Sequence, residues 1–267
     1  TKSAHAGVSG GQNGFSYSAQ VSDKTSDSFA AALPTVHYVT YDPSQHGFRA
    51  TSSSGRLSYQ WASNQELGMN YLYSEGWNRY NGYASVGTDN KAYQKVTSVG
   101  AYTKNKINDR WNSKFQLGQT VDDSINYANN ALLYSYKTVQ DQFVWQNDVD
   151  FASGLALLGY EKLNQRVGGS SANYTVNARS VDSLIAGWVK SYDAHQLQIN
   201  GRRDQNSQFG AKSTGMVGYA YRLSSQWRIK SSVGTAFKVP TFNDLYFPMT
   251  DGYYGNPKLL PESSLNR

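Results

Sequence analysis

The chain has 267 residues, no cysteine, 16% charged residues, 14% aromatic residues and a formal net charge of +6. The lack of cysteine excludes disulfide frameworks and cysteine-based metal sites. Lys and Arg are scattered along the chain and form no basic patch, so we expect no nucleic-acid partner. No apolar run approaches the ~18 residues of a membrane helix. A negative mean hydropathy does not exclude a membrane barrel, because lipid-facing and lumen-facing residues alternate and cancel in the average.

Period-two alternation of apolar and polar residues is the dominant pattern and predicts β-strands. Its first clear instance runs from Phe15 to Val21, where every second residue is serine or glutamine. A similar pattern recurs along the chain, and helical periodicity is nearly absent. We predict about twelve strands, with a thirteenth starting after Ser264. Their approximate ranges are 2–10, 14–26, 48–62, 66–76, 92–104, 110–121, 134–148, 154–165, 178–192, 195–204, 212–222 and 226–237.

The connections between these strands alternate in length. Short turns are predicted at 11–13, 63–65, 105–109, 149–153, 193–195 and 223–226, and longer loops at 27–47, 77–91, 122–133, 166–177, 205–211 and 238–263. Short turns on one side and long loops on the other are typical of antiparallel outer-membrane barrels. Many aromatic residues are predicted near strand ends, where they would form belts at the two membrane–water interfaces. These are Trp61, Tyr71, Tyr73, Trp77, Tyr102, Trp111, Trp145, Trp188, Tyr192, Tyr219, Tyr221 and Trp227.

The stretch Gly234–Ser264 differs from the rest of the chain. It holds four of the six prolines, and proline cannot donate to a strand ladder. We therefore predict that it leaves the sheet as an ordered excursion and returns near Ser264.

This stretch resembles the signature of TonB-dependent outer-membrane receptors. The matching residues are Phe237, Lys238, Pro240, Leu245, Tyr246, Gly255, Asn256, Pro257, Leu259, Pro261, Glu262 and Ser264. The resemblance implies an all-β, antiparallel transmembrane β-barrel of 22 strands in the outer membrane of a Gram-negative bacterium, surrounded by outer-membrane lipid. It also implies an N-terminal plug and a segment that binds the energy-coupling protein TonB. Residues 1–267 are then expected to be a partial barrel of about twelve strands, without the plug and the last barrel strands.

A second stretch makes the resemblance more specific. Within Gly201–Gly210, the residues Asp204 and Asn206–Gly210 are similar to a pattern of cobalamin (vitamin B12) transporters of this family. The implied function is active uptake of a scarce micronutrient, with cobalamin as the expected ligand. A siderophore or haem receptor is the alternative within the family, and a passive porin-like or structural barrel is the alternative outside it.

Metal binding has little support. Cobalamin transporters bind calcium through an aspartate-rich loop, and calcium takes about six to eight oxygen ligands. The corresponding loop, 27–47, offers only Asp27 and Asp42, with Glu75 on the next strand. His37 and His46 share that loop and keep the haem alternative open, but no third ligand with useful spacing accompanies them. We predict no metal site, and calcium stays an open alternative.

Five loop aromatics are the expected ligand contacts, because pockets for large ligands combine aromatic walls with a few polar groups. They are Trp77, Tyr80, Tyr83, Tyr127 and Tyr134. Alternatively, each ring is an interfacial anchor or packs within a loop.

No arrangement of residues supports catalysis, so the protein is not expected to be an enzyme. The sequence has no nucleotide-binding loop and no Ser/His/Asp arrangement of known spacing. Asp122 and Asp123 are adjacent, and adjacent strand residues point to opposite faces, so we place them at the start of a loop. An outer-membrane barrel protease would need acidic and histidine residues gathered at the barrel top, and the sequence shows no such cluster.

Overall fold

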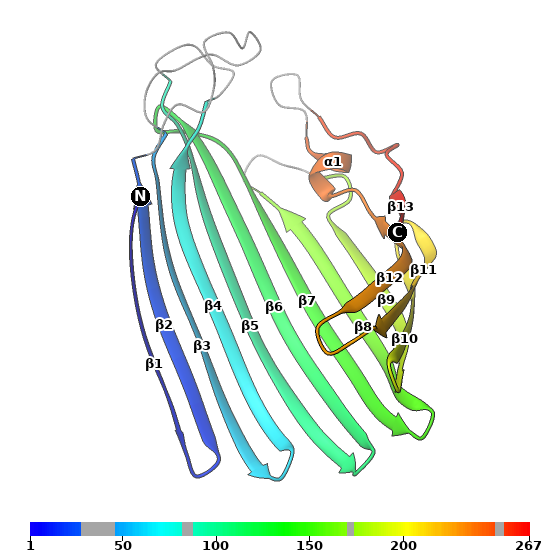
Figure 1. Ribbon diagram of the computed structural model, residues 1–267. Coiled ribbons are helices and arrows are strands. Elements are labelled where there is room, and N and C mark those ends of the chain that lie inside the picture. The colour runs from blue at the N-terminus through cyan, green and yellow to red at the C-terminus, as the bar shows by residue number, and fades with distance from the viewer. Residues whose placement is uncertain (28–45, 82–87, 170–173, 249–253) are drawn as a thin grey trace.

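The computed structural model describes residues 1–27, 46–81, 88–169, 174–248 and 254–267. Thirteen strands form one sheet in which each strand pairs antiparallel with the next (Figure 1). Within the described residues, no helix is long and apolar enough to cross a membrane. The strands are β1 (Lys2–Gln12), β2 (Phe15–Ser26), β3 (Phe48–Ala62), β4 (Gln65–Arg79), β5 (Asn90–Asn108), β6 (Trp111–Ala128), β7 (Ala131–Phe151), β8 (Gly154–Gly168), β9 (Ala178–Tyr192), β10 (His195–Asn206), β11 (Gly210–Arg222), β12 (Arg228–Lys238) and β13 (Glu262–Asn266).

The predicted all-β antiparallel fold is confirmed, and three of its details were wrong. The loop predicted at 122–133 does not exist, because β6 and β7 continue upward and meet in a turn at Asn129 and Asn130. Asp122 and Asp123 are therefore strand residues. The connection predicted at 205–211 is only three residues long, between Asn206 and Gly210, and β13 begins at Glu262, before Ser264.

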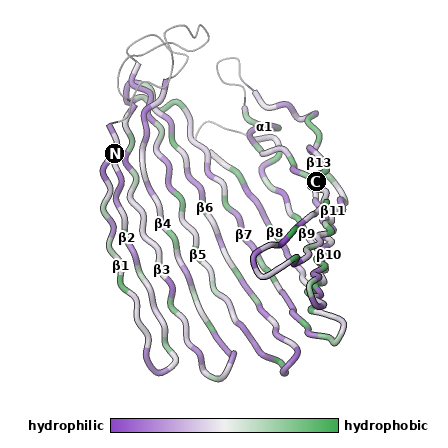
Figure 2. Tube along the Cα trace, viewed as in Figure 1, coloured by the Kyte–Doolittle hydropathy of each residue, from purple (hydrophilic) through white to green (hydrophobic). Residues whose placement is uncertain are grey.

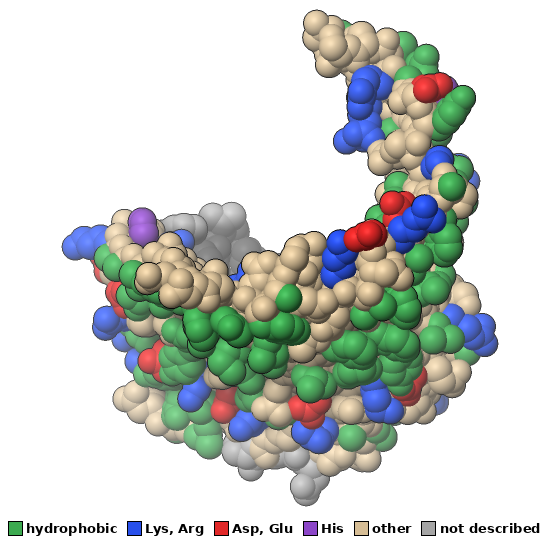
Figure 3. All heavy atoms as spheres, turned by 90° about the horizontal axis from the view of Figure 1, so that it is seen from below, with side chains coloured by type: hydrophobic (Ala, Val, Ile, Leu, Met, Phe, Trp, Pro, Cys, Tyr) green, Lys and Arg blue, Asp and Glu red, His purple; other side chains and the backbone are tan. Residues whose placement is uncertain are grey.

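The sheet is curved, and its two faces differ in chemistry. The convex side, here called the outer face, carries Leu57, Met69 and Leu117, which are 47%, 56% and 61% exposed. Seen from below, hydrophobic side chains cover this side of the arc (Figure 3). The concave side, the inner face, carries polar residues such as Arg56 and Glu66. Hydrophobic and hydrophilic residues are interspersed along the strands (Figure 2), and their alternation between two faces is the pattern of a barrel wall between lipid and a wet lumen.

Short turns join each odd-numbered strand to the next at the lower end of the sheet (Figure 1). Asn13, Asn64 and Asp193 adopt positive φ angles of 53°, 57° and 50° there, a backbone conformation that asparagine and aspartate tolerate well in tight hairpins. The longer connections lie at the upper end. This asymmetry confirms the predicted arrangement of turns and loops, apart from the two upper connections corrected above.

Aromatic residues gather at the lower end of the outer face. The rings of Phe15 and Tyr59 lie 4.4 Å apart, and those of Phe115 and Trp145 stack at 5.7 Å. Tyr102 does not join them, although we predicted it in the belt. It points to the inner face, is 9% exposed and donates a hydrogen bond of 2.6 Å to Glu66.

The proline-rich stretch leaves the sheet after β12, as predicted, and its described part includes the short helix α1 (Phe242–Tyr246). Thr241 caps this helix in a reciprocal capping box with Asp244, which satisfies two backbone donors that would otherwise lack partners. The buried side chains Phe242 and Leu245 anchor α1. Phe242 packs against Val167 of β8 and against Tyr174, so α1 covers part of the inner face near its upper end.

Candidate functional site

Aromatic side chains form a patch on the upper part of the inner face. We define the tyrosine patch as Tyr80, Tyr134, Tyr136, Tyr174 and Phe247. Tyr134 stacks on Tyr136 at 6.5 Å, and Phe247 meets Tyr134 and Tyr174 edge-on at 5.8 and 6.5 Å. The patch therefore joins the top of β7 to the segment that follows α1.

Amide groups accompany these rings. The hydroxyl of Tyr80 donates to the side-chain oxygen of Asn126, at 3.3 Å, and that of Tyr174 donates to Asn243 at 2.6 Å. Burial raises the pKa of Tyr80 to about 12, and it does the same for the pKa of Tyr174. Both hydroxyls are therefore neutral at physiological pH. A surface of rings, hydroxyls and amides suits a large, uncharged ligand that carries both apolar and hydrogen-bonding groups.

The structure brings two of the five predicted contact residues together. Tyr80 and Tyr134 belong to the tyrosine patch, and the hydroxyl of Tyr134 contributes to the raised pKa of Tyr80. Tyr83 lies outside the described residues.

Trp77 and Tyr127 lie elsewhere, on the outer face. Trp77 packs between Arg79 and Lys91, whose charged groups are 5.7 and 5.5 Å from its ring. It lines an outer-face cavity of about 510 Å³. Tyr127 meets Tyr93 edge-on at 5.6 Å. Their positions favour the alternative we left open, that of interfacial anchors.

The two stretches that carry the family resemblance touch each other. The side chain of Gln208 donates to the hydroxyl of Tyr246 in α1. Gly255, from the Gly-Asn-Pro motif, donates its backbone N–H to Phe247 at 2.9 Å. A Cβ at Gly255 would overlap the backbone of Leu245 and Tyr246, so this position needs glycine for close approach. Both motifs thus hold α1 in place beside the patch.

Some charged side chains on the inner face form a hydrogen-bonded network around Arg202. Arg202 donates to Glu161 at 2.9 Å, to Asp204 at 2.7 Å and to Ser183 at 2.7 Å. The side chains of Glu161 and Asp204 are only 15% and 9% exposed. Such a network fixes the side chains of the lumen wall.

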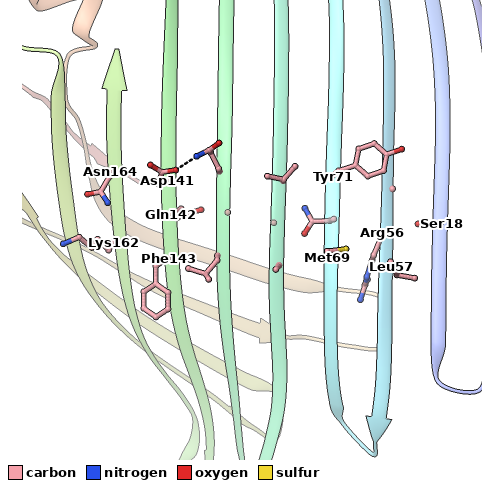
Figure 4. Close-up of a pocket in the computed structure, with 18 residues that line it drawn as sticks. Ser18, Arg56, Leu57, Met69, Tyr71, Asp141, Gln142, Phe143, Lys162 and Asn164 are labelled. Atoms are coloured by element: carbon pink, nitrogen blue, oxygen red, sulfur yellow. Dashed lines mark hydrogen bonds between the residues drawn. The ribbon is translucent and has the colours of Figure 1, made fainter. Parts of the chain in front are cut away.

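A cavity of about 780 Å³ forms a groove across the outer face. Its labelled lining residues include Leu57, Met69, Tyr71 and Phe143 (Figure 4). These side chains belong to the apolar outer surface, so the groove is distinct from the tyrosine patch on the inner face.

The described residues hold no group of three His, Cys, Asp or Glu side chains that could bind a metal ion. Glu75 accepts a hydrogen bond of 2.6 Å from Tyr73 on the outer face. Asp42 and His37 lie outside the described residues, whereas His46 lies just before β3.

Sequence reasoning missed Tyr136, Tyr174 and Phe247. Tyr136 could have been found, because it is two residues from Tyr134 on the same strand and therefore on the same face. Tyr174 and Phe247 lie outside the strands, so no local sequence pattern predicts their positions.

A model of the family described as TonB dependent receptor-like, beta-barrel, matches residues 3–267. The chain is 26% identical over 227 residues to the vitamin B12 transporter BtuB of Photobacterium profundum, covering 85% of this chain and 36% of that protein. It is 27% identical over 254 residues to BtuB of Vibrio vulnificus, covering 91% of this chain and 39% of that protein.

Solved structures share the fold. The siderophore receptor PirA of Pseudomonas aeruginosa superposes with a TM-score of 0.72 at 17% identity, covering 98% of this chain and 47% of that one. The ferric enterobactin receptor of the same organism, in complex with enterobactin, gives a TM-score of 0.73 at 16% identity with the same coverage. The chain thus spans less than half the length of these relatives. Since the family model matches almost all of it, the chain belongs to the TonB-dependent receptor β-barrel family.

Proposed function

We propose that this protein takes up cobalamin across the outer membrane of a Gram-negative bacterium, driven by TonB. Family membership and the two BtuB relatives support the proposal. The observation that carries it in this chain is the tyrosine patch, which lies on the inner face near the upper end, where the longer connections lie.

In this proposal, the chain is slightly more than the first half of a 22-stranded barrel. Its relatives extend well beyond the region that it matches. A sheet with two unpaired edges cannot persist in lipid, because its backbone groups would lack hydrogen-bond partners. In this proposal the remaining strands close the sheet, and the plug and the TonB-binding segment implied by the family resemblance complete the receptor.

The patch would bind the ligand by contacts that need no charge. Cobalamin is a bulky molecule with an apolar ring system and many amide groups. The rings of Tyr134 and Phe247 would pack against its apolar surface, and the half-buried amide of Asn243 would exchange hydrogen bonds with its amide groups. The plug would complete the site and transmit the pull of TonB.

Equilibrium binding of cyanocobalamin to the complete receptor in detergent tests this function. We expect a dissociation constant in the nanomolar range, and repeating the measurement with and without calcium decides whether the ion contributes. An iron–siderophore complex and haem serve as competing ligands. Failure to bind cyanocobalamin, by folded protein that binds one of these competitors, would overturn the cobalamin assignment in favour of the siderophore or haem alternative.

A further inference from the structure

Arg179 in β9 occupies an unusual position on the inner face. It is only 9% exposed, and among the described residues its guanidinium forms no ion pair with a carboxylate. A buried charge without a counter-ion is costly unless hydrogen bonds satisfy it.

The bonds of Arg179 connect the sheet to the proline-rich stretch. Its Nε donates to the side-chain oxygen of Gln165 in β8 at 2.7 Å, and its Nη1 donates to the backbone oxygen of Pro240 at 2.8 Å. The guanidinium also lies over the ring of Phe242, 4.6 Å from its centroid. One side chain therefore fixes both the residue that leads into α1 and the first residue of α1.

The contacts continue from Phe242 to the tyrosine patch. Phe242 is 5% exposed and forms a cluster with Val167 and Tyr174, against which Phe247 packs. Phe247 in turn meets the ring of Tyr134. If Arg179 released α1, Phe247 would lose the support that keeps it beside Tyr134.

We propose that Arg179 is a positioning residue, which holds α1 against the inner face and so keeps Phe247 in the tyrosine patch. Arginine suits this role because its planar fork donates in two directions while its face stacks on an aromatic ring. Arg179 itself does not contact the ligand in this proposal. The claim about α1 is independent of the proposed function, and only the claim about ligand affinity rests on it.

The test compares Arg179→Met and Arg179→Lys in the complete receptor. Methionine keeps much of the packing and loses both hydrogen bonds, whereas lysine keeps the charge over Phe242 and one donor. Arg203→Met is the matched control, since Arg203 is exposed on the neighbouring strand and donates to Ser213 at 3.3 Å. If Arg179→Met does not insert, Phe242→Leu removes the same contact from the other side.

The first measurement needs no ligand. A lysine-specific protease can cut after Lys258, which is exposed, when the stretch detaches locally. A hydrogen bond from a charged donor contributes about tenfold or more to an equilibrium, so Arg179→Met should speed this cleavage about tenfold or more. Arg179→Lys should give an intermediate rate, and Arg203→Met the wild-type rate. Unchanged cleavage in Arg179→Met would overturn the proposal.

The second measurement is cyanocobalamin affinity. We expect about a tenfold loss in Arg179→Met and partial rescue in Arg179→Lys, in the order of the cleavage rates. Faster cleavage with unchanged affinity would show that α1 does not shape the site, and would overturn the link to the patch. Wild-type receptor that does not bind cyanocobalamin would overturn the proposed function instead, and the cleavage rates would still decide whether Arg179 holds α1.

Discussion

Replacing Leu117 by arginine tests which face of the sheet contacts lipid. Leu117 lies on the outer face of β6, is 61% exposed and pairs with Ala101 and Phe143. It is six residues above Trp111, the first residue of the strand. At ~3.4 Å per residue and a tilt of ~40°, six residues raise the side chain roughly 15 Å, close to the middle of an apolar band ~25 Å tall.

An arginine at this depth should destabilise the folded receptor by about 2–4 kcal/mol. That cost corresponds to a change of roughly 30- to 900-fold in the folding equilibrium. The matched control is Gln116→Arg, one residue away and on the inner face, where the added charge meets the wet lumen. We expect its effect to be less than about 1 kcal/mol, as for other surface substitutions.

Urea unfolding of the complete receptor in lipid vesicles measures both costs, with the mobility of the folded band in gels as the readout. If Leu117→Arg cannot insert at all whereas Gln116→Arg inserts, the result would agree with a larger cost on the outer face. Equal costs at the two positions, or a larger cost at Gln116, would refute the assignment of the two faces.

Three further predictions concern the tyrosine patch and α1. Tyr134→Ala should weaken cyanocobalamin binding roughly 5- to 30-fold, whereas Tyr127→Ala on the outer face should not change it; equal losses would show that the patch has no special role. Gly255→Ala should speed cleavage of the proline-rich stretch, because its Cβ would overlap the α1 backbone, while Gly201→Ala has free space and should not; similar rates would contradict this packing. Burial raises the pKa of Tyr174 to about 12, which is above the value of an unfolded tyrosine. The stability that the neutral Tyr174 hydroxyl contributes is therefore complete below about pH 10 and is lost as pH approaches 12. If the absorbance titrations of the wild-type protein and Tyr174→Phe differ near pH 10, Tyr174 titrates normally and this prediction is refuted.

The sequence predicted the strands well where lipid imposes alternation, and poorly above that level. The adjacent carboxylates Asp122 and Asp123 place a charge on both faces of β6 and interrupt its alternation, so a loop was predicted at 122–133. In the structure, Asp123 pairs across the ladder with Lys95 and Lys137. Opposite charges on neighbouring strands support a sheet, but this pairing becomes visible only once the register is known. Helix α1, with five residues, is likewise too short to show a helical period.

In the candidate site, the number of residues between two positions on a strand predicts whether their side chains share a face, but it does not predict the positions of loop residues. Trp77 is an even number of residues from Met69, and Tyr80 is an odd number, so their opposite faces follow from the alternation alone. By the same count, Tyr134 is an odd number of residues from Trp145 on the outer face, so it lies on the inner face. Phe247 obeys no such rule, because its position depends on α1 and therefore on Arg179, 68 residues earlier in the chain. A ligand surface on a barrel wall can thus be predicted as far as the strands carry it, whereas the part supplied by loops depends on tertiary contacts that the local sequence does not encode.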